Sequence, residues 1–342
     1  MNRKLRDFLT LPMSERTPDA FLKISYDSDV TMLMTPDMVQ WSEEDKIYAA
    51  SKSSNVMCLC ENPSDAVMMA TLDNWAGYYG SLKNPSYAVT LYALKLDGDN
   101  IRYVENPSAE LCLAAVQQNG RALQYLAPEL HTEEIRVAAV QKNGWALEHI
   151  EDPTHEMTLA AVVQNGGVLS IVKNKTYEIC LAAVKSSGTA IEYVDDVFRT
   201  EELCMAAVRS VSWAIEHVPT QTKEMCIHAV TTNGFTLEFV KEQTEELCLI
   251  AVNDEAEALE YVREQTEAIC LAAVTKSGHA LLHVKEQTEA ICLAAVTDVP
   301  EILGHVKNQT MEICLAAVQV DPDVVLLIRD EEMRHMVQIL MI

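Results

Sequence analysis

Apolar residues recur along the chain in blocks of a fixed length, 22 residues. The block is clearest at 266–287, where the apolar run Ile269–Val274 comes first. Gly278 follows, then a shorter apolar group beginning at Ala280, and then a polar linker. A constant period of this size is the sequence signature of stacked repeats, in which each copy buries its apolar face only against its neighbours.

One column of the repeat, mostly cysteine, fixes the frame along the chain. Its members are Lys46, Met68, Thr90, Cys112, Arg136, Thr158, Cys180, Cys204, Cys226, Cys248, Cys270, Cys292 and Cys314. All steps are 22 residues except Cys112 to Arg136 and Cys180 to Cys204, which are 24. The frame predicts about thirteen units over residues 42–330.

Each unit predicts two short helices joined by a turn. Thr266 is suited to cap the first helix, and Glu267 favours the positive end of its dipole. The cap position holds Ser or Thr in every other unit, at Ser42, Ser64, Ser86, Ser108, Thr132, Thr154, Thr176, Thr200, Thr222, Thr244, Thr288 and Thr310. We expect Ile269–Val274, apolar on all sides, to be buried among neighbouring helices. Gly278 is predicted to end the helix in the left-handed conformation.

The predicted fold is therefore all-α, a right-handed α-solenoid of about thirteen two-helix repeats. Residues 1–41 fall outside the repeat and are predicted to form an N-terminal capping segment. Residues 331–342 form either a C-terminal cap or a dimerisation helix that makes a homo-oligomer. The cap is favoured, because terminal repeats need their open faces covered.

The E-x-C-L-A-A-V block followed by G-x-A-L-x-x-V, as in Glu178–Val184 with Gly188–Val194, resembles a known family. That family is an uncharacterised group of short α-helical repeats in bacterial, phage and giant-virus proteins, and it is similar in kind to leucine-rich-variant solenoids. The resemblance implies a helical solenoid and no settled activity. The early units depart from it, since Lys46 and Met68 replace the cysteine.

The charge narrows the choice of partner. The net charge is −25, from 51 acidic and 26 basic residues. Phosphate backbones and anionic lipids repel such a chain, so we expect neither direct nucleic-acid binding nor membrane binding, and a protein partner with a basic surface. The sequence shows no proper signal-peptide core and no run of 18 apolar residues. It predicts a cytoplasmic protein, in the host cytoplasm if a virus or phage encodes it.

The cysteines do not predict a metal or disulfide site. Column members one repeat apart are about 10 Å from one another, whereas zinc holds sulfur at about 2.3 Å and disulfides need Cα atoms within about 7 Å. We expect reduced, buried cysteines, no metal and no cofactor. Cys58 and Cys60 form a C-x-C pair for which core packing is favoured over redox or metal chemistry.

Two rows on the second helix are the candidate binding residues. The ring stripe consists of His149, Tyr193, His217, Phe239, Tyr261, His283 and His305, with Tyr103 and Tyr125 before them. The glutamate row directly precedes it, at Glu148, Glu192, Glu216, Glu238 and Glu260. The rings either contact a partner or pack between successive second helices, and the glutamates either imitate phosphates or form a solvated face. A further acidic row is favoured as helix-dipole stabilisation, at Glu110, Glu134, Glu156, Glu178, Glu202, Glu224, Glu246 and Glu312.

The sequence contains no P-loop, G-x-G-x-x-G, H-E-x-x-H or G-x-S-x-G motif, so we expect no catalytic residues and no enzyme activity. The favoured function is a macromolecule-binding solenoid. The sharpest hypothesis within it is an acidic nucleic-acid mimic that inhibits a host nucleic-acid-binding or defence enzyme. The alternatives are a neutral adaptor or scaffold and an enzyme with an unrecognised site.

Overall fold

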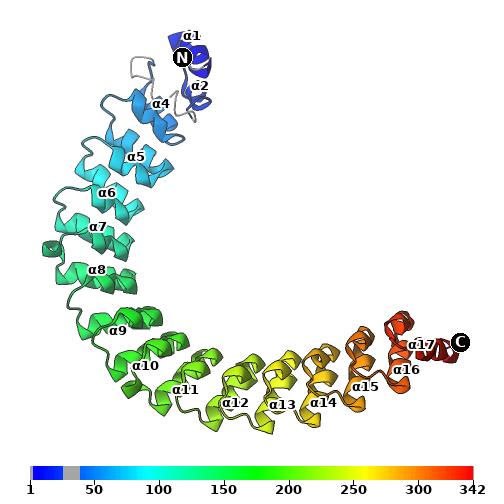
Figure 1. Cartoon of the computed structure of the whole chain (residues 1–342). Helices are drawn as coiled ribbons and strands as arrows, with labels where there is room; N and C mark the ends of the chain where they lie inside the picture. Colours follow the sequence, from blue (N-terminus) through cyan, green and yellow to red (C-terminus); the bar gives the residue numbers. More distant parts are fainter. Residues whose placement is uncertain (1–2, 26–38, 342) are drawn as a thin grey trace. The chain divides into compact units, whose positions relative to one another are not determined.

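The computed structural model describes residues 3–25 and 39–341, and every regular element in these two ranges is a helix (Figure 1). The chain divides into two compact units, Met1–Gln164 and Asn165–Ile342. Within each unit, successive α-helices contact one another side by side, as do successive 3-10 helices (η). The predicted all-α repeat solenoid is confirmed, and its handedness stays a prediction.

The helices of the first unit are α1 (Arg3–Thr10), η1 (Met13–Glu15), α2 (Pro18–Leu22), α4 (Glu43–Ala50), η3 (Ser54–Leu59), α5 (Asp65–Asn74), η4 (Ala76–Ser81), α6 (Tyr87–Leu96), η5 (Gly98–Tyr103), α7 (Ala109–Gln118), η6 (Gly120–Tyr125), η7 (Pro128–Leu130), α8 (Glu133–Lys142), η8 (Gly144–His149) and α9 (His155–Gln164).

The helices of the second unit are η9 (Gly166–Ile171), α10 (Tyr177–Ser186), η10 (Gly188–Tyr193), η11 (Asp196–Phe198), α11 (Glu201–Ser210), η12 (Ser212–His217), α12 (Lys223–Thr232), η13 (Gly234–Phe239), α13 (Glu245–Asp254), η14 (Ala256–Tyr261), α14 (Glu267–Lys276), η15 (Gly278–His283), α15 (Glu289–Asp298), η16 (Pro300–His305), α16 (Met311–Val320), η17 (Pro322–Leu327) and α17 (Glu331–Leu340).

The second helix of each repeat is a 3-10 helix. In η15, Ala280 N donates to Ser277 O at 2.9 Å and Val284 N donates to Leu281 O at 3.2 Å, the i to i+3 pattern. Six residues are too few to nucleate an α-helix at low cost, and the tighter 3-10 turn holds such short pieces. Ala280 and Leu281 are fully buried and Val284 is nearly so, as their spacing predicts.

The predicted helix caps are present. Thr266 Oγ1 accepts a hydrogen bond from Ile269 N at 3.4 Å, and the same contact occurs in each repeat from Ser42 to Thr310. Some caps also join neighbouring repeats, because Thr288 Oγ1 donates to Glu267 Oε1 of the preceding repeat at 2.9 Å. The acid beside the cap therefore supports stacking as well as the helix dipole.

The predicted left-handed conformation of Gly278 is wrong. No glycine among the described residues has a positive φ. Helix α14 instead ends at Ser277, which is extended with φ −152° and ψ 118°. A Cβ on Gly278 would lie 2.6 Å from the carbonyl oxygen of Ala295 in the next repeat. The glycine is needed for close approach of α15, not for an unusual φ.

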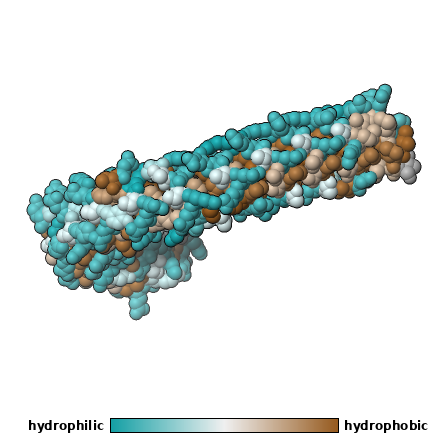
Figure 2. Space-filling model, turned by 90° about the horizontal axis from the view of Figure 1, so that it is seen from below, coloured by the Kyte–Doolittle hydropathy of each residue, from teal (hydrophilic) through white to brown (hydrophobic). Residues whose placement is uncertain are grey.

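The expected burial of the first helix on all sides is also wrong. In α14, Ile269, Cys270, Ala273 and Val274 are buried, whereas Leu271–Ala272 is only partly buried. Neighbouring α-helices and the 3-10 layer cover three sides of α14, so its fourth side faces solvent. Figure 2 shows hydrophobic residues recurring in rows along the C-terminal repeats, beside hydrophilic rows.

A glutamine in the linker joins neighbouring repeats. Gln243 Nε2 donates to the carbonyl oxygens of Leu237 and Tyr261, each at 3.0 Å, and its Oε1 accepts from Arg263 N at 2.9 Å. All three bonds recur at Gln221, Gln265 and Gln309, and two of them, to His305 O and from Lys307 N, recur at Gln287. The linker thus holds successive 3-10 helices at a fixed offset.

The two 24-residue steps add a short turn, η7 or η11, to the linker. After η11, Arg199 takes the place of the glutamine: its Nε donates to Val194 O at 2.9 Å and its Nη1 to His217 O at 3.3 Å. After η7, His131 Nε2 lies 3.3 Å from Leu126 O. Arg199 therefore keeps the bond to the last residue of the next 3-10 helix, His217, which corresponds to Tyr261 for Gln243. Its other bond, like that of His131, goes to the residue just after the preceding 3-10 helix.

The segments outside the repeats pack against their nearest repeat. The Phe21 ring lies 5.6 Å from the Trp41 ring and joins a core with Ala49 of α4. Residues 1–2 and 26–38 of the predicted capping segment, and residue 342 at the other end, lie outside the described residues. Helix α17 contacts α16 and buries Val337, while Ile339 remains 57% exposed. Capping and dimerisation through α17 both stay predictions.

Candidate binding surface

The glutamate row lies on the 3-10 layers, and all five members are exposed. Glu148 and His149 belong to η8 in the first unit. The other candidates lie in the second unit: Glu192 and Tyr193 in η10, Glu216 and His217 in η12, Glu238 and Phe239 in η13, Glu260 and Tyr261 in η14, His283 in η15 and His305 in η16. Because these 3-10 helices contact one another in order, the second unit places its candidates in one continuous row.

Most rings of the stripe are partly buried, and two of them pack on aromatic residues of the preceding repeat. The Phe239 ring lies 5.5 Å from the Trp213 ring at an interplanar angle of 70°. The Tyr261 ring lies 6.3 Å from the Phe235 ring at 88°. Such edge-to-face pairs stabilise the stack by about 0.5–1.5 kcal/mol each. The packing role considered for the stripe is therefore real at these two positions.

Trp213 and Phe235 were not among the candidates predicted from the sequence. They are the second residues of η12 and η13, and each contacts a ring 26 residues later in the chain. That separation is one 22-residue repeat plus four residues. A search for aromatic residues 26 apart would have found both pairs.

The glutamate row and the ring stripe touch across repeats. Glu260 Oε2 lies 4.0 Å from Nδ1 of His283. In the first unit a cation makes the equivalent contact between repeats: the Arg102 guanidinium lies 4.7 Å from the centre of the Tyr125 ring. Each contact joins the fifth residue of one 3-10 helix to the last residue of the next. Among the described residues, Glu260 is the one member of the row with a basic side chain within 4.0 Å of its carboxylate.

The acidic row at the start of the α-helices is more committed to contacts within the fold. Glu202 accepts from Tyr177 Oη at 2.9 Å, Glu224 pairs with Arg209 at 3.0 Å and Glu246 pairs with Lys223 at 2.6 Å. These contacts join neighbouring repeats, in addition to the favourable position of a carboxylate at a helix N-terminus. The row is therefore a weaker candidate for partner binding.

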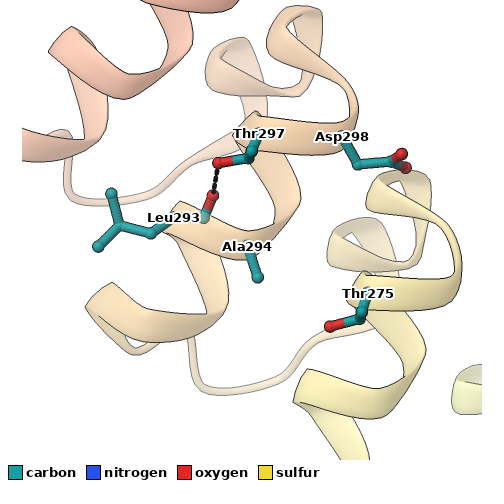
Figure 3. A pocket seen from close by; sticks show the side chains of 5 residues that line it. All are labelled: Thr275, Leu293, Ala294, Thr297 and Asp298. Carbon is teal, nitrogen blue, oxygen red and sulfur yellow. Dashed lines mark hydrogen bonds between the residues drawn. The ribbon is translucent and has the colours of Figure 1, made fainter.

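A shallow depression lies between α14 and α15, lined by Thr275, Leu293, Ala294, Thr297 and Asp298 (Figure 3). Two of its three polar side chains already have partners, because Thr297 Oγ1 donates to Leu293 O at 2.7 Å and Asp298 Oδ2 accepts from Gly278 N at 2.7 Å. Sites for small molecules need several polar groups that converge on a ligand. This depression lacks that arrangement.

The eight column cysteines are buried, with at most 5% of any side chain exposed, as their position in the repeat predicts. Cys270 Sγ lies 3.7 Å from Oε1 of Gln265. Burial raises the pKa of the Cys270 thiol, and it raises that of Cys58, together with the nearby Cys60, to about 11. Such thiols are poor nucleophiles near neutral pH.

Within residues 3–25 and 39–341, no three His, Cys, Asp or Glu side chains are placed to share a metal ion. In the same part of the chain, no helix combines the length and apolar character that crossing a membrane requires.

Residues 109–153 and 176–223 match a family described as a domain of unknown function (DUF4116). The two matched stretches cover repeats in both units and are similar to that family in sequence. No curated protein and no solved structure matches the chain.

Proposed function

We propose that the chain is a non-catalytic protein-binding solenoid that uses the 3-10 layers of its second unit to bind a basic surface. The observation that supports this function is the glutamate row. Glu192, Glu216 and Glu238 are exposed on successive 3-10 helices, and the described side chains give them no cationic partner. Carboxylates without an internal partner are available to pair with lysine and arginine of another protein.

The spacing of the row supports mimicry of nucleic acid. Stacked helices lie about 8–10 Å apart, so carboxylates in successive repeats follow one another at that distance. Three base pairs of duplex DNA rise by about 10 Å. The row therefore repeats at about the axial rise of three base pairs, and we propose that it inhibits a nucleic-acid-binding enzyme by occupying its binding surface.

The setting we propose is the cytoplasm of a host cell. The resemblance to short helical repeats of bacterial, phage and giant-virus proteins supports counter-defence, in which the target is a nuclease or another defence enzyme. Counter-defence is proposed from that resemblance, because a fold by itself does not define a function.

A neutral adaptor is the second candidate. The partly buried apolar residues on the open side of the α-helices favour it, and in the second unit they include Leu181, Met205, Ile227, Leu249, Leu271, Leu293 and Leu315. An adaptor that uses this side would bind through apolar contacts, which salt weakens little.

The deciding experiment is affinity capture from a cytosolic extract at two salt concentrations, with and without excess duplex DNA. Mimicry predicts that a nucleic-acid-handling enzyme is recovered, that DNA and salt both displace it, and that the purified chain inhibits it. A partner that stays bound in the presence of DNA contradicts mimicry and favours the adaptor.

A further inference from the structure

The second unit contains two corners of aromatic rings, one repeat apart. The first corner is formed by Trp213 and Phe239, and the second by Phe235 and Tyr261. Trp213 is 41% exposed, and the other three rings are partly exposed. Two rings at a steep angle provide two walls, the arrangement in which proteins hold cationic groups.

Each corner has a glutamate that lies on the same side of a 3-10 helix as one of the two rings. Side chains three residues apart in a 3-10 helix are eclipsed, so Glu216 lies on the side of η12 that carries Trp213. The same spacing places Glu238 with Phe235 on η13. Each corner therefore combines two aromatic walls with one exposed carboxylate, which together favour a cation.

In the first unit a cation lies over a ring of the same column as Phe239 and Tyr261. Arg102 is the fifth residue of η5, the place that Glu216 and Glu238 occupy in η12 and η13. Its guanidinium lies over the Tyr125 ring of the next repeat at 4.7 Å, and 5.5 Å from the Tyr103 ring. In the second unit a carboxylate replaces this internal cation, so a cation at the corners has to come from a partner.

The separation of the corners fits an extended peptide. Adjacent repeats are about 8–10 Å apart. Three residues of polyproline II helix span about 9.3 Å, and every third side chain returns to the same face.

We propose that the 3-10 face binds an extended segment of its partner that carries arginine at every third residue. Successive guanidinium groups enter the Trp213–Phe239 and Phe235–Tyr261 corners and pair with Glu216 and Glu238. Arginine suits the corners better than lysine, because its planar group stacks on rings and pairs with carboxylates in two contacts. This inference rests on the proposed function, since it specifies the basic partner.

The test uses the full chain and two fluorescent peptides of equal composition, followed by anisotropy. One peptide has four Arg-Pro-Pro triplets, and the other has a block of four arginines followed by eight prolines. We expect the periodic peptide to bind about tenfold more tightly. Trp213→Leu and Phe235→Leu keep apolar volume but remove the ring, and each should weaken the periodic peptide about fivefold.

The matched control separates the corners from general charge. Glu216→Gln with Glu238→Gln should remove the preference for the periodic peptide, whereas Glu242→Gln with Glu264→Gln, which neutralises two exposed linker glutamates, should keep it. If a leucine variant loses its helical signal, Trp213→Phe and Phe235→Tyr replace it, and these variants should retain binding.

The inference is overturned if the two peptides bind with equal affinity, or if neither peptide binds. It is also overturned if the two double glutamine variants lose the preference for the periodic peptide equally. None of these results decides the proposed function. An acidic face that does not recognise the spacing of the arginines would still capture an enzyme that duplex DNA displaces. Mimicry fails when DNA leaves the captured partner in place.

Discussion

A Cβ on Gly278 would lie 2.6 Å from the carbonyl oxygen of Ala295, so the glycine of one repeat sets the distance to the α-helix of the next. The same contact recurs in both units, at 2.3 Å between Gly120 and Ala139 and at 2.4 Å between Gly188 and Ala207. The obstacle is backbone, which cannot rotate away as a flexible side chain can. Where glycine occupies this position, it therefore sets how closely two repeats stack, whereas Ser212, Ala256 and Pro300 occupy it in other repeats.

Gly278→Ala should lower the free energy of unfolding by about 1–3 kcal/mol, because the added methyl group overpacks the contact between repeats. Urea denaturation followed by circular dichroism measures this. Gly304→Ala is the matched control, since the nearest atom to a Cβ at Gly304 is Leu327 Cδ2 at 4.0 Å, and it should change stability little. Similar costs for the two variants would show that the close approach is not the reason for the glycine.

The linker glutamine provides a second test of stacking. Gln243→Leu removes the donor to Leu237 O and Tyr261 O and the acceptor for Arg263 N. Leaving such groups unpaired costs about 1–3 kcal/mol in the free energy of unfolding, measured by urea denaturation. Glu242→Leu, at the neighbouring exposed position, should stay within about 0.5 kcal/mol of the wild type. A loss no larger for Gln243→Leu than for Glu242→Leu would contradict the role of the amide.

Whether a feature of the fold could be predicted from the sequence depends on how far apart along the chain its interacting residues lie. The cap at Thr266 is decided by the next three residues, so the Ser/Thr column identified it. Cys270 recurs at a fixed position, so its burial was also predictable. The role of Gly278 depends on Ala295 in the next repeat, and a local pattern for a helix end suggested the wrong conformation.

The residues of the candidate surface also fall into those that the sequence identified and those that it did not. The sequence placed Glu216 and Phe239 in regular rows, because period alone defines them. It did not identify Trp213, because the reason for that residue is a ring 26 positions away. The linker glutamine was missed for a similar reason, since Gln243 binds the carbonyl oxygen of Tyr261, 18 positions ahead.

The buried cysteines predict how stability changes with pH. Burial raises the pKa of the Cys248, Cys270 and Cys292 thiols above the ordinary value of 9.0. Unfolded thiols lose their protons near pH 9.0 and folded ones only at higher pH, so the unfolded state binds fewer protons in this range. The stabilising contribution is complete below pH 9.0 and is lost as pH rises through the folded pKa values.

Urea denaturation at pH 8 and pH 10 tests this expectation. Replacing Cys248, Cys270 and Cys292 by alanine should lower stability at both values but make the decrease between them smaller. Tyrosines and lysines that titrate in the same range are present in both proteins, so their contribution cancels. Equal decreases in the two proteins would mean that the column thiols titrate alike in the folded and unfolded states.

The glutamate row gives the most direct prediction about binding. Reversing Glu216, Glu238 and Glu260 to lysine should abolish capture of the target, because three carboxylates that pair with its basic surface become three repelling charges. The side chains are exposed, so the helical circular dichroism signal and the unfolding midpoint should persist. The control reverses Glu242, Glu264 and Glu286, which are exposed in the linkers and change the net charge equally. If the control lost the target to the same degree, total charge would account for binding. Undiminished capture by the row variant would show that the partner binds elsewhere, and the apolar side of the α-helices would then be the surface to mutate.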